Sequence, residues 1–261
     1  MKGNFRSFWR HLERWLTLLL ILAVLIIWEG LVRAGMISPL FFPSPSFIFL
    51  TFIKLITSGK LVANIMATLL RVFSGLIWGG VPGLILGLAM GWSSRLRTII
   101  DPLIAAAHPV PKIAILPLIM ILFGIGESSK IIVVSLATFF PLLINAMAGV
   151  RQISPIHFEV ADNYGATTSK IFTRIILPGS LPMILAGIRL ALNMSLLVTI
   201  AVELVAAQEG LGAMIWLSWQ TLRTEELYVS LGVTAFLGIL FNFLLRRATV
   251  FLVPWQLEQN H

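Results

Sequence analysis

Four ionisable side chains lie inside or at the edges of long apolar stretches: Arg71, Lys112, Arg189 and Glu203. Charged groups at such positions are costly, so they usually face a water-filled cavity or one another. A cation beside a solute path would offset part of the desolvation of an anion, provided that binding stays weak enough for release. For Arg71 and Arg189 we favour instead a side chain that reaches toward a headgroup region, because each lies near the expected end of a helix.

Lys112 is the stronger candidate for a substrate path. Prolines surround it and would break a helix, which lets backbone and polar groups line a cavity: Pro109, Pro111 and Pro117. Glu203 would repel an anion, so a structural hydrogen bond or a gating role suits it better. Asn145 and Asn193 could add uncharged hydrogen-bond donors to a path.

No catalytic, nucleotide or metal site is evident in the sequence. The segment 124–130 has the length of part of a phosphate-binding loop, but Ser129 replaces the glycine required before the lysine and Ile131 replaces the Ser/Thr that would hold Mg²⁺. Cysteine is absent, and the histidines are scattered without metal-ligand spacing: His11, His108, His157 and His261. We therefore expect this chain to bind no cofactor and to perform no chemistry of its own.

Composition indicates which solvent surrounds these residues. Hydrophobic residues make up 58% of the 261 and charged residues 11%, and the mean hydropathy is +0.95. Soluble domains carry roughly a quarter charged residues, so most of this surface must face lipid. The net charge of +8 is more simply explained by basic cytoplasmic loops than by nucleic-acid binding.

Six stretches approach the roughly 20 apolar residues that a helix needs to cross a bilayer. They are Leu16–Val32, Ala67–Met90, Ile99–Phe123, Ile131–Val150, Leu181–Ala207 and Tyr228–Val253. With both termini in the cytoplasm, the inner segments hold eleven Lys and Arg residues and the outer segments hold five. This asymmetry favours both termini inside.

No linker divides the chain, so we expect one transmembrane domain over residues 1–261. Its expected parts are a cytoplasmic N-terminus (1–15), a first span with an outer-face loop (16–64), a core bundle (65–253) and a cytoplasmic tail (254–261). Within the outer-face loop, Phe41–Thr57 should be an extended turn followed by a helix on the membrane surface, because its prolines suit a loop.

Glycine recurs at every fourth position of the second stretch: Gly75, Gly79, Gly83, Gly87 and Gly91. Such a strip lets another helix approach backbone to backbone, which is how helices associate in lipid. Tight packing is the simpler interpretation. A surface that slides or hinges during transport is the alternative.

The longest polar segment on the expected cytoplasmic side is 151–180. Ser154 and Pro155 can start a short helix, and Gly165 permits a backbone reversal. Thr167 or Thr168 can cap a second helix, which we expect Pro178 to end. Two short amphipathic helices bent about a glycine would suit docking on another protein, or could simply lie on the membrane.

This segment resembles the EAA loop of binding-protein-dependent ABC importer permeases. The resemblance rests on Glu159-x-Ala161, on Gly165, and on Ile175-x-Leu177-Pro178, with Val160 where a second alanine is usual. It implies an all-α, integral membrane, MetI-like type I importer bundle in the cytoplasmic (inner) membrane. It also implies that 151–180 is the coupling loop, docked on a separate ATPase that holds ATP and Mg²⁺.

Further stretches are similar to the branch that handles nitrate, bicarbonate, taurine and alkanesulfonates. They are Phe42–Pro45, Leu116–Leu118, Phe123–Glu127, Ser129-Lys130, and Glu203 with Gly210-Leu211-Gly212. The resemblance implies two permease copies over two ATPase subunits, an external substrate-binding protein, and alternating access for a small anion. An uncharged vitamin precursor is an alternative cargo within this family.

Rival functions make different demands on the chain. A channel or passive facilitator would explain the spans and predicts flux without ATP, but it leaves the cytoplasmic segment without a purpose. An intramembrane enzyme needs paired carboxylates, clustered histidines or an activated serine, and none is evident. An exporter would usually have longer cytoplasmic helices, often fused to the ATPase.

Overall fold

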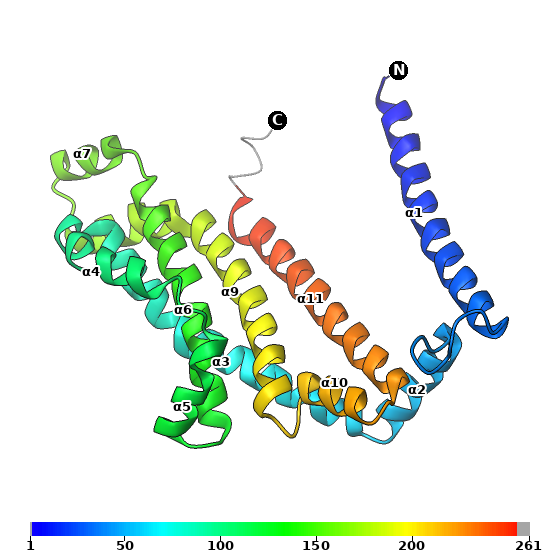
Figure 1. The fold of residues 1–261 in the computed structure, drawn as a ribbon. Helices are drawn as coiled ribbons and strands as arrows, with labels where there is room; N and C mark the ends of the chain where they lie inside the picture. The colour runs from blue at the N-terminus through cyan, green and yellow to red at the C-terminus, as the bar shows by residue number, and fades with distance from the viewer. Residues whose placement is uncertain (1, 255–261) are drawn as a thin grey trace. The chain divides into compact units, whose positions relative to one another are not determined.

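In the computed structural model, the described residues, 2–254, form helices and the turns between them (Figure 1). Side chains are described for residues 15–17 and 19–254. The described residues end at Pro254, and the rest of the expected cytoplasmic tail 254–261 lies outside them. The elements are α1 Lys2–Arg33, α2 Pro45–Thr57, α3 Lys60–Trp92, α4 Ser94–Ala107, the 3-10 turn η1 Ile113–Ile115, α5 Leu116–Phe123, α6 Glu127–Arg151, α7 Pro155–Asn163, α8 Thr168–Ile171, the π-helical segment η2 Phe172–Ile176, α9 Leu177–Ala206, α10 Leu211–Gln220 and α11 Thr224–Leu252.

Five helical stretches in the described chain are long and apolar enough to cross a membrane: Trp15–Arg33, Lys60–Trp92, Glu127–Arg151, Thr168–Ala206 and Thr224–Leu252. The all-helical membrane class is therefore confirmed. The described residues divide into two compact units, which are the residues up to 62 with 214–232 (unit 1) and residues 63–213 with those from 233 to Pro254 (unit 2).

The expected third span, Ile99–Phe123, is wrong as a continuous helix. The chain there forms α4, η1 and α5, with an interruption at His108–Lys112. Pro109 and Pro111 lack the N–H groups that a helix needs, and each disfavours helical geometry in the residue before it. The segment nevertheless leads from α4, at the end of unit 2 near α7, to α5 at the opposite end (Figure 1). In the described chain, five long helices and a broken helical segment over 94–123 thus replace the six expected spans.

The fifth span is longer than expected. Pro178 does not end the second helix of the 151–180 segment, because helical geometry continues from Thr168 through η2 into α9. A proline ring conflicts with the carbonyl four residues earlier in a regular α-helix. Here that carbonyl belongs to Arg174, which lies in the π-helical segment. The distortion is accommodated there, and the helix runs on.

In unit 1, side-chain contacts connect α1, the loop that follows it, α2 and the start of α11. The carboxylate of Glu29 accepts hydrogen bonds from the backbone N and the hydroxyl of Ser46, at 3.0 and 2.7 Å. Thr224 donates to the carbonyl of Leu40 at 2.7 Å, and Tyr228 packs against Trp28 with ring centroids 5.8 Å apart. As expected, an extended turn precedes a short helix, α2.

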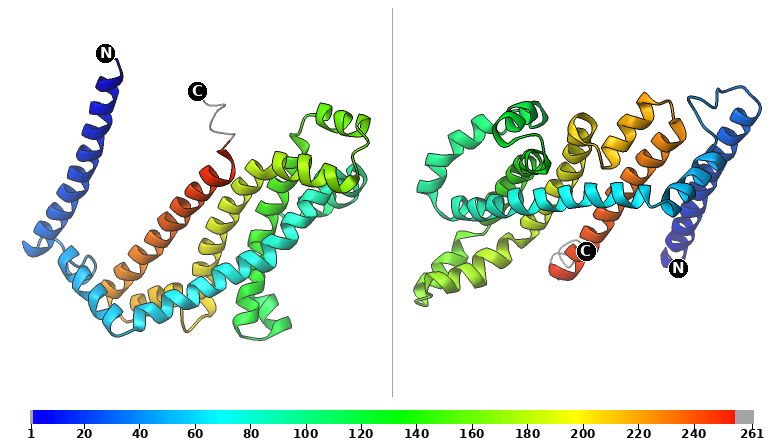
Figure 2. Two further views of the ribbon diagram at one scale, coloured as in Figure 1. Left: turned by 180° about the vertical axis from the view of Figure 1, so that it is seen from behind. Right: turned by 90° about the horizontal axis from the view of Figure 1, so that it is seen from below.

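Unit 2 is built around α3, α6 and α9, which lie side by side in both views of Figure 2. One buried cluster joins α5, α6 and α9, and a second joins α3, α6, η2 and α9. Hydroxyl groups bond across the helices: Thr138 donates to the carbonyl of Gly75 and Ser195 to that of Val72, both at 2.8 Å. The two candidate sites described next lie at opposite ends of this three-helix core.

Candidate functional site

The 151–180 segment forms a helical hairpin that projects from one end of unit 2 (Figure 1). Pro155 occupies the first turn of α7, preceded by Ser154 in extended geometry. Gly165 follows α7 with φ +66°, its N–H bonds the carbonyl of Asp162, and the N–H of Ala166 bonds that of Ala161. These two bonds form a Schellman ending, in which glycine is favoured for its left-handed backbone. The chain therefore reverses at Gly165 for a defined geometric reason.

The hairpin has one face packed inward and one face open. Phe158 packs against the core cluster of α3, α6 and α9, and Ala161 is buried. Ile156, Val160 and Tyr164, spaced four residues apart, are 53%, 48% and 87% exposed. Because residues four apart share a helix face, the outward side of α7 carries an apolar stripe.

The other candidate coupling residues divide between the two faces. Glu159 is exposed beside the stripe and lines a hollow of about 400 Å³ with Trp92 of α3. Ile175 and Pro178 are half-buried at the junction with α9, where Leu177 is 40% exposed. Ala161, whose expected role was docking, supports α7 from within.

At the other end of unit 2, Arg71 of α3 and Glu203 of α9 form a buried ion pair. Arg71 is 3% exposed and Glu203 is fully buried, with Nη1 2.7 Å from Oε1. The guanidinium also makes two bonds to Glu127 of α6, from Nε at 2.7 Å and Nη2 at 2.8 Å. Nη1 donates in addition to the carbonyl of Glu209 at 2.6 Å. Four of its five N–H groups are thus engaged.

The second oxygen of Glu203 accepts hydrogen bonds from the start of α10 and from α3. Oε2 accepts from the N–H of Gly212 at 2.9 Å and from the hydroxyl of Thr68 at 3.0 Å. Thr68 in turn accepts from the N–H of Leu211 at 2.9 Å. A Cβ at Gly210 would lie 2.4 Å from Cδ of Glu203, so glycine lets the turn close over the carboxylate.

Lys130 completes what we call the buried charge network: Arg71, Glu203, Glu127 and Lys130. Its ammonium lies 2.7 Å from Oε1 of Glu127, and the side chain is 10% exposed. Glu127 is the most open member, with a side chain 52% exposed. It borders a cavity of about 790 Å³ that is lined mainly by apolar residues of α3, with Arg71 and Glu209.

These contacts change the interpretation of two residues. The prediction that Arg71 reaches toward a headgroup region is wrong in this conformation, because its charge is buried and paired. Glu203 makes structural hydrogen bonds, which was one of its two expected roles. Sequence reasoning missed Glu127, Lys130 and Thr68 as partners. The motif stretch at 123–130 was the available signal for Glu127 and Lys130, and no motif marked Thr68.

The remaining path candidates lie apart from this network. Lys112 is half-buried, donates to the carbonyls of Ala107 and His108 at the end of α4, and lies 4.4 Å from the ring centroid of Phe140. Asn145 bonds within α6, to the carbonyl of Pro141 at 2.8 Å. Asn193 exchanges amide hydrogen bonds with Asn242 of α11, at 3.1 and 3.4 Å. Arg189 is exposed.

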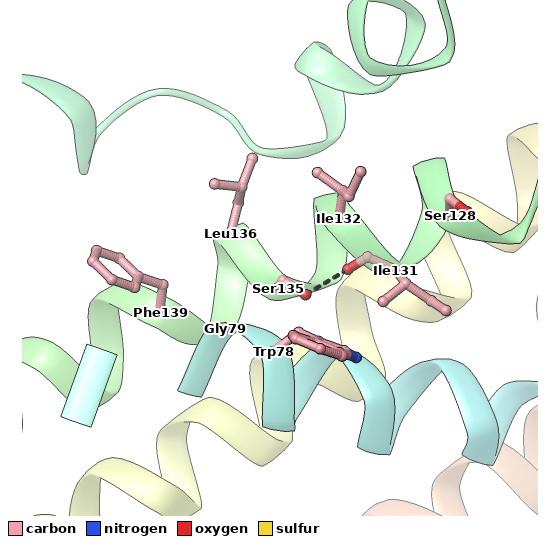
Figure 3. Close-up of a pocket in the computed structure, with 8 residues that line it drawn as sticks. All are labelled: Trp78, Gly79, Ser128, Ile131, Ile132, Ser135, Leu136 and Phe139. Atoms are coloured by element: carbon pink, nitrogen blue, oxygen red, sulfur yellow. Dashed lines mark hydrogen bonds between the residues drawn. The ribbon is translucent and has the colours of Figure 1, made fainter. Parts of the chain in front are cut away.

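The glycine strip of α3 faces α6. A Cβ at Gly79 would lie 1.9 Å from the carbonyl oxygen of Ser135, and one at Gly83 would lie 2.4 Å from that of Phe139. Gly75, Gly87 and Gly91 make similar approaches. Beside this contact, a hollow of about 460 Å³ opens between α3 and α6, where Trp78 faces Ile131 and Phe139 (Figure 3). Its lining is mainly apolar, with the hydroxyl of Ser135 bonded back to Ile131.

Within the part of the chain that the structure describes, no group of three metal-binding side chains comes together. The candidate site is therefore a docking surface at one end of unit 2 and a buried charge network at the other.

Comparison with known proteins assigns the family. Residues 83–257 match the family described as "Binding-protein-dependent transport system inner membrane component". The chain is 36% identical over 246 residues to the taurine transport system permease protein TauC of Escherichia coli (strain K12), covering 91% of this chain and 88% of that protein. It is 34% identical over 243 residues to the putative aliphatic sulfonates transport permease protein SsuC of Bacillus subtilis (strain 168), covering 93% and 88%.

Two further comparisons bear on cargo and fold. The formylaminopyrimidine transport permease protein ThiX of Halalkalibacterium halodurans is 31% identical over 242 residues, covering 92% of this chain and 96% of that protein. A solved structure of the MetNI methionine ABC transporter in inward-facing conformations has the same fold, with a TM-score of 0.64 and 20% identity over 74% of this chain and 96% of that one. Permeases of this class have no nucleotide site and rely on a separate ATPase subunit. The chain therefore belongs to the binding-protein-dependent inner membrane components and is the permease component of an ABC importer.

Proposed function

We propose that this permease carries a small organic sulfonate or a related anion inward by alternating access, coupled to its ATPase through residues 151–180. The observation that carries the coupling is the exposed apolar stripe of Ile156, Val160 and Tyr164 on α7. An exposed apolar surface of this kind marks contact with another protein or with the membrane, and the resemblance of residues 151–180 to the coupling loop of importer permeases favours the ATPase as its partner.

The substrate class follows from the relatives rather than from a pocket. Two relatives at 34% identity or more are named for taurine and aliphatic sulfonates. Another, at 31% identity, is named for formylaminopyrimidine, which keeps an uncharged cargo as the second candidate. Lys112 remains our candidate cation for an anion path, because its ammonium bonds only backbone carbonyls and no carboxylate among the described residues, whereas Arg71 and Lys130 are paired with carboxylates.

The expected assembly has two identical permease copies, two ATPase subunits and an external binding protein. The pathway would lie between the two copies, since one chain with five long helices is small for a transporter. Both termini would lie in the cytoplasm, which places α7 on the inner side and the buried charge network near the outer side. ATP binding would draw α7 inward with the closing ATPase pair and so open the path outward.

The coupling proposal is tested by co-purification of the tagged permease with its ATPase. Glu159→Lys reverses an exposed charge beside the stripe, and Gly165→Val removes the left-handed turn that closes α7. We expect both to lose the ATPase or to uncouple ATP hydrolysis from uptake. The matched control is Gly35→Val, a loop glycine with a similar φ of +70° in unit 1.

Uptake into proteoliposomes that contain the complete transporter tests the rest. Radiolabelled taurine, an alkanesulfonate, nitrate and formylaminopyrimidine should be compared with and without ATP. ATP-dependent uptake of a sulfonate supports the proposal. Flux that proceeds without ATP through the permease alone would instead establish the channel or facilitator.

A further inference from the structure

We propose that Arg189 of α9 and Arg246 of α11 bind the phosphate group of an anionic phospholipid in the inner leaflet. Asn193 and Asn242 hold the two helices in the register that brings these arginines to the same level. We call these four residues the arginine–asparagine cluster. It is separate from the solute path and depends only on the orientation proposed above, with both chain termini in the cytoplasm.

Two contacts fix the alignment of α9 with α11. The amide groups of Asn193 and Asn242 exchange hydrogen bonds at 3.1 and 3.4 Å. A Cβ added to Gly238 would lie 3.7 Å from Cδ2 of Leu196. Because the position in α11 rises as the position in α9 falls, the two helices are antiparallel over this stretch.

The same register brings two arginines together one turn further along. Arg189 precedes Asn193 by four positions and Arg246 follows Asn242 by four, and residues four apart share a helix face. Each arginine is thus displaced by about 6 Å from its asparagine, and antiparallel packing makes the direction the same in both helices. Both arginines are exposed, so two cations share one surface beside the asparagine pair.

These two cations have no carboxylate partner in the part of the chain that the structure describes. The basic residues that form ion pairs there are Arg33, Lys60, Arg71, Lys130 and Arg223. Like charges repel, and a charge that faces lipid without a partner is costly. An anion from outside the chain would offset both costs.

The position of the cluster indicates that this anion belongs to a lipid. Arg246 lies less than two turns before α11 ends at Leu252, at the same end of unit 2 as the start of α9 (Figure 1). Arg189 lies about 21 Å along α9 from Glu203, which places it in the inner part of a hydrocarbon layer about 30 Å thick. Long cationic side chains at such depths reach toward the headgroups.

The neighbouring side chains suit acyl chains. Exposed apolar residues flank the cluster on both helices: Leu190, Met194 and Leu197 on α9, and Ile239, Phe243 and Val250 on α11. A guanidinium presents a planar fork of N–H groups that matches two phosphate oxygens. Basic residues beside the inner leaflet also attract anionic lipids. Charge and apolar surface therefore match the two parts of one phospholipid.

The transported anion suits this cluster less well. A site on a solute path must bind weakly enough to release its solute, and Arg247 adds a third positive charge next to the pair. Lys112, with a single charge, meets that condition better. A structural lipid can stay bound throughout the transport cycle, so tight binding is no disadvantage for it.

Native mass spectrometry of the complete transporter, released from detergent micelles, tests the site. Phosphatidylglycerol and the zwitterionic phosphatidylethanolamine are titrated separately, and the bound lipids are counted. We expect wild type to prefer phosphatidylglycerol, and Arg189→Gln and Arg246→Gln each to weaken its binding by about fivefold. Binding of phosphatidylethanolamine should change little. The wild-type comparison needs no variant, and equal binding of the two lipids by wild type would overturn the proposal.

Arg247→Gln is the matched control. It removes an adjacent positive charge from the same helix, but that guanidinium lies 5.3 Å from the ring centroid of Phe243. We expect it to weaken binding of phosphatidylglycerol much less than Arg246→Gln does. Equal losses for Arg189→Gln, Arg246→Gln and Arg247→Gln would mean that net charge alone attracts the lipid, and the defined site would be wrong. Thermal unfolding of each variant confirms that it is folded.

Competition distinguishes a lipid site from a site for the cargo. Taurine or an alkanesulfonate is added to wild type that carries phosphatidylglycerol, and we expect the lipid to stay bound. Displacement by either sulfonate would overturn the proposal and assign the cluster to the solute path. Failure of the proposed function would be seen elsewhere, as absent ATP-driven uptake in proteoliposomes, with the lipid preference retained.

Discussion

Gly210 lies so close to Glu203 that a Cβ added to it would be 2.4 Å from Cδ of Glu203, inside the volume that the carboxylate occupies. Gly210 also has φ +121°, a backbone conformation in which side chains are disfavoured. The residue is thus doubly restricted to glycine, by its own backbone and by its neighbour. Glycine at position 210 thus allows the turn to close over a buried acid.

Gly210→Ala should therefore destabilise the protein far more than a positive φ alone would. At Gly59, with φ +76° and nothing within 4 Å of an added Cβ, alanine should cost about 1–2 kcal/mol. At Gly210 the same change should add an overpacking cost of about 1–3 kcal/mol. Thermal unfolding in detergent, followed by tryptophan fluorescence, measures both variants side by side. Equal losses of stability would show that the contact with Glu203 carries no energy.

Arg71 and Glu203 should be strongly coupled in a double-mutant cycle. Arg71→Met leaves a buried carboxylate unpaired, whereas Glu203→Met leaves Arg71 bonded to Glu127. We expect Arg71→Met to be the more damaging, at about 3–5 kcal/mol, and the double variant to be more stable than the two single losses would predict. The same unfolding assay measures all three proteins. Strict additivity would contradict a direct pair.

The elements that sequence patterns could predict are those with strong local signals. Long apolar runs predicted the four helices α3, α6, α9 and α11 and the second half of α1. Gly165 predicted the chain reversal after α7. The pairing of Arg71 with Glu203 could not be assigned, because it joins residues 132 positions apart. Their opposite charges within apolar stretches were the only clue to it.

Two boundaries failed for physical reasons. The Ile99–Phe123 stretch is apolar enough to cross a membrane. A hydropathy average does not detect the prolines that divide this stretch into separate helices. Pro178 was expected to end a helix, but the π-helical segment before it absorbs the conflict with its ring. Prolines therefore accompany the interruption at 108–112 but do not locate helix ends by themselves, because others lie inside α3, α4, α6 and α9: Pro82, Pro102, Pro141 and Pro182.

Adjacent glycines of α3 offer a sharp test of the packing against α6. A Cβ at Gly79 would meet the backbone carbonyl of Ser135 at 1.9 Å, whereas one at Gly80 would meet only a side-chain methyl of Leu142 at 2.6 Å. The backbone of α6 cannot move locally to relieve the first clash, whereas the side chain of Leu142 can adopt another rotamer to relieve the second. We expect Gly79→Ala to cost about 3 kcal/mol, at the upper end for overpacking.

The matched control Gly80→Ala should cost less than about 1 kcal/mol, since only a side chain must move. Both substitutions add the same methyl group to neighbouring positions of one helix, so differences in helix propensity cancel. Thermal unfolding of the two purified proteins decides the point. A larger loss for Gly80→Ala would mean that α6 approaches α3 along a different line.

Val160 and Ala161 should separate docking from folding, because these neighbours in α7 differ in exposure. Val160 is 48% exposed and Ala161 is 8% exposed. Val160→Asp places a charge on the apolar stripe, which should weaken binding of the ATPase by at least about tenfold, or 1.4 kcal/mol, with an unchanged unfolding temperature. Ala161→Asp buries an unpaired charge and should lower that temperature. Titration of the purified ATPase onto the permease in nanodiscs, together with thermal unfolding, gives both quantities for each variant. If Val160→Asp bound the ATPase as tightly as wild type, the stripe would face lipid, and coupling would have to run through other residues of the hairpin.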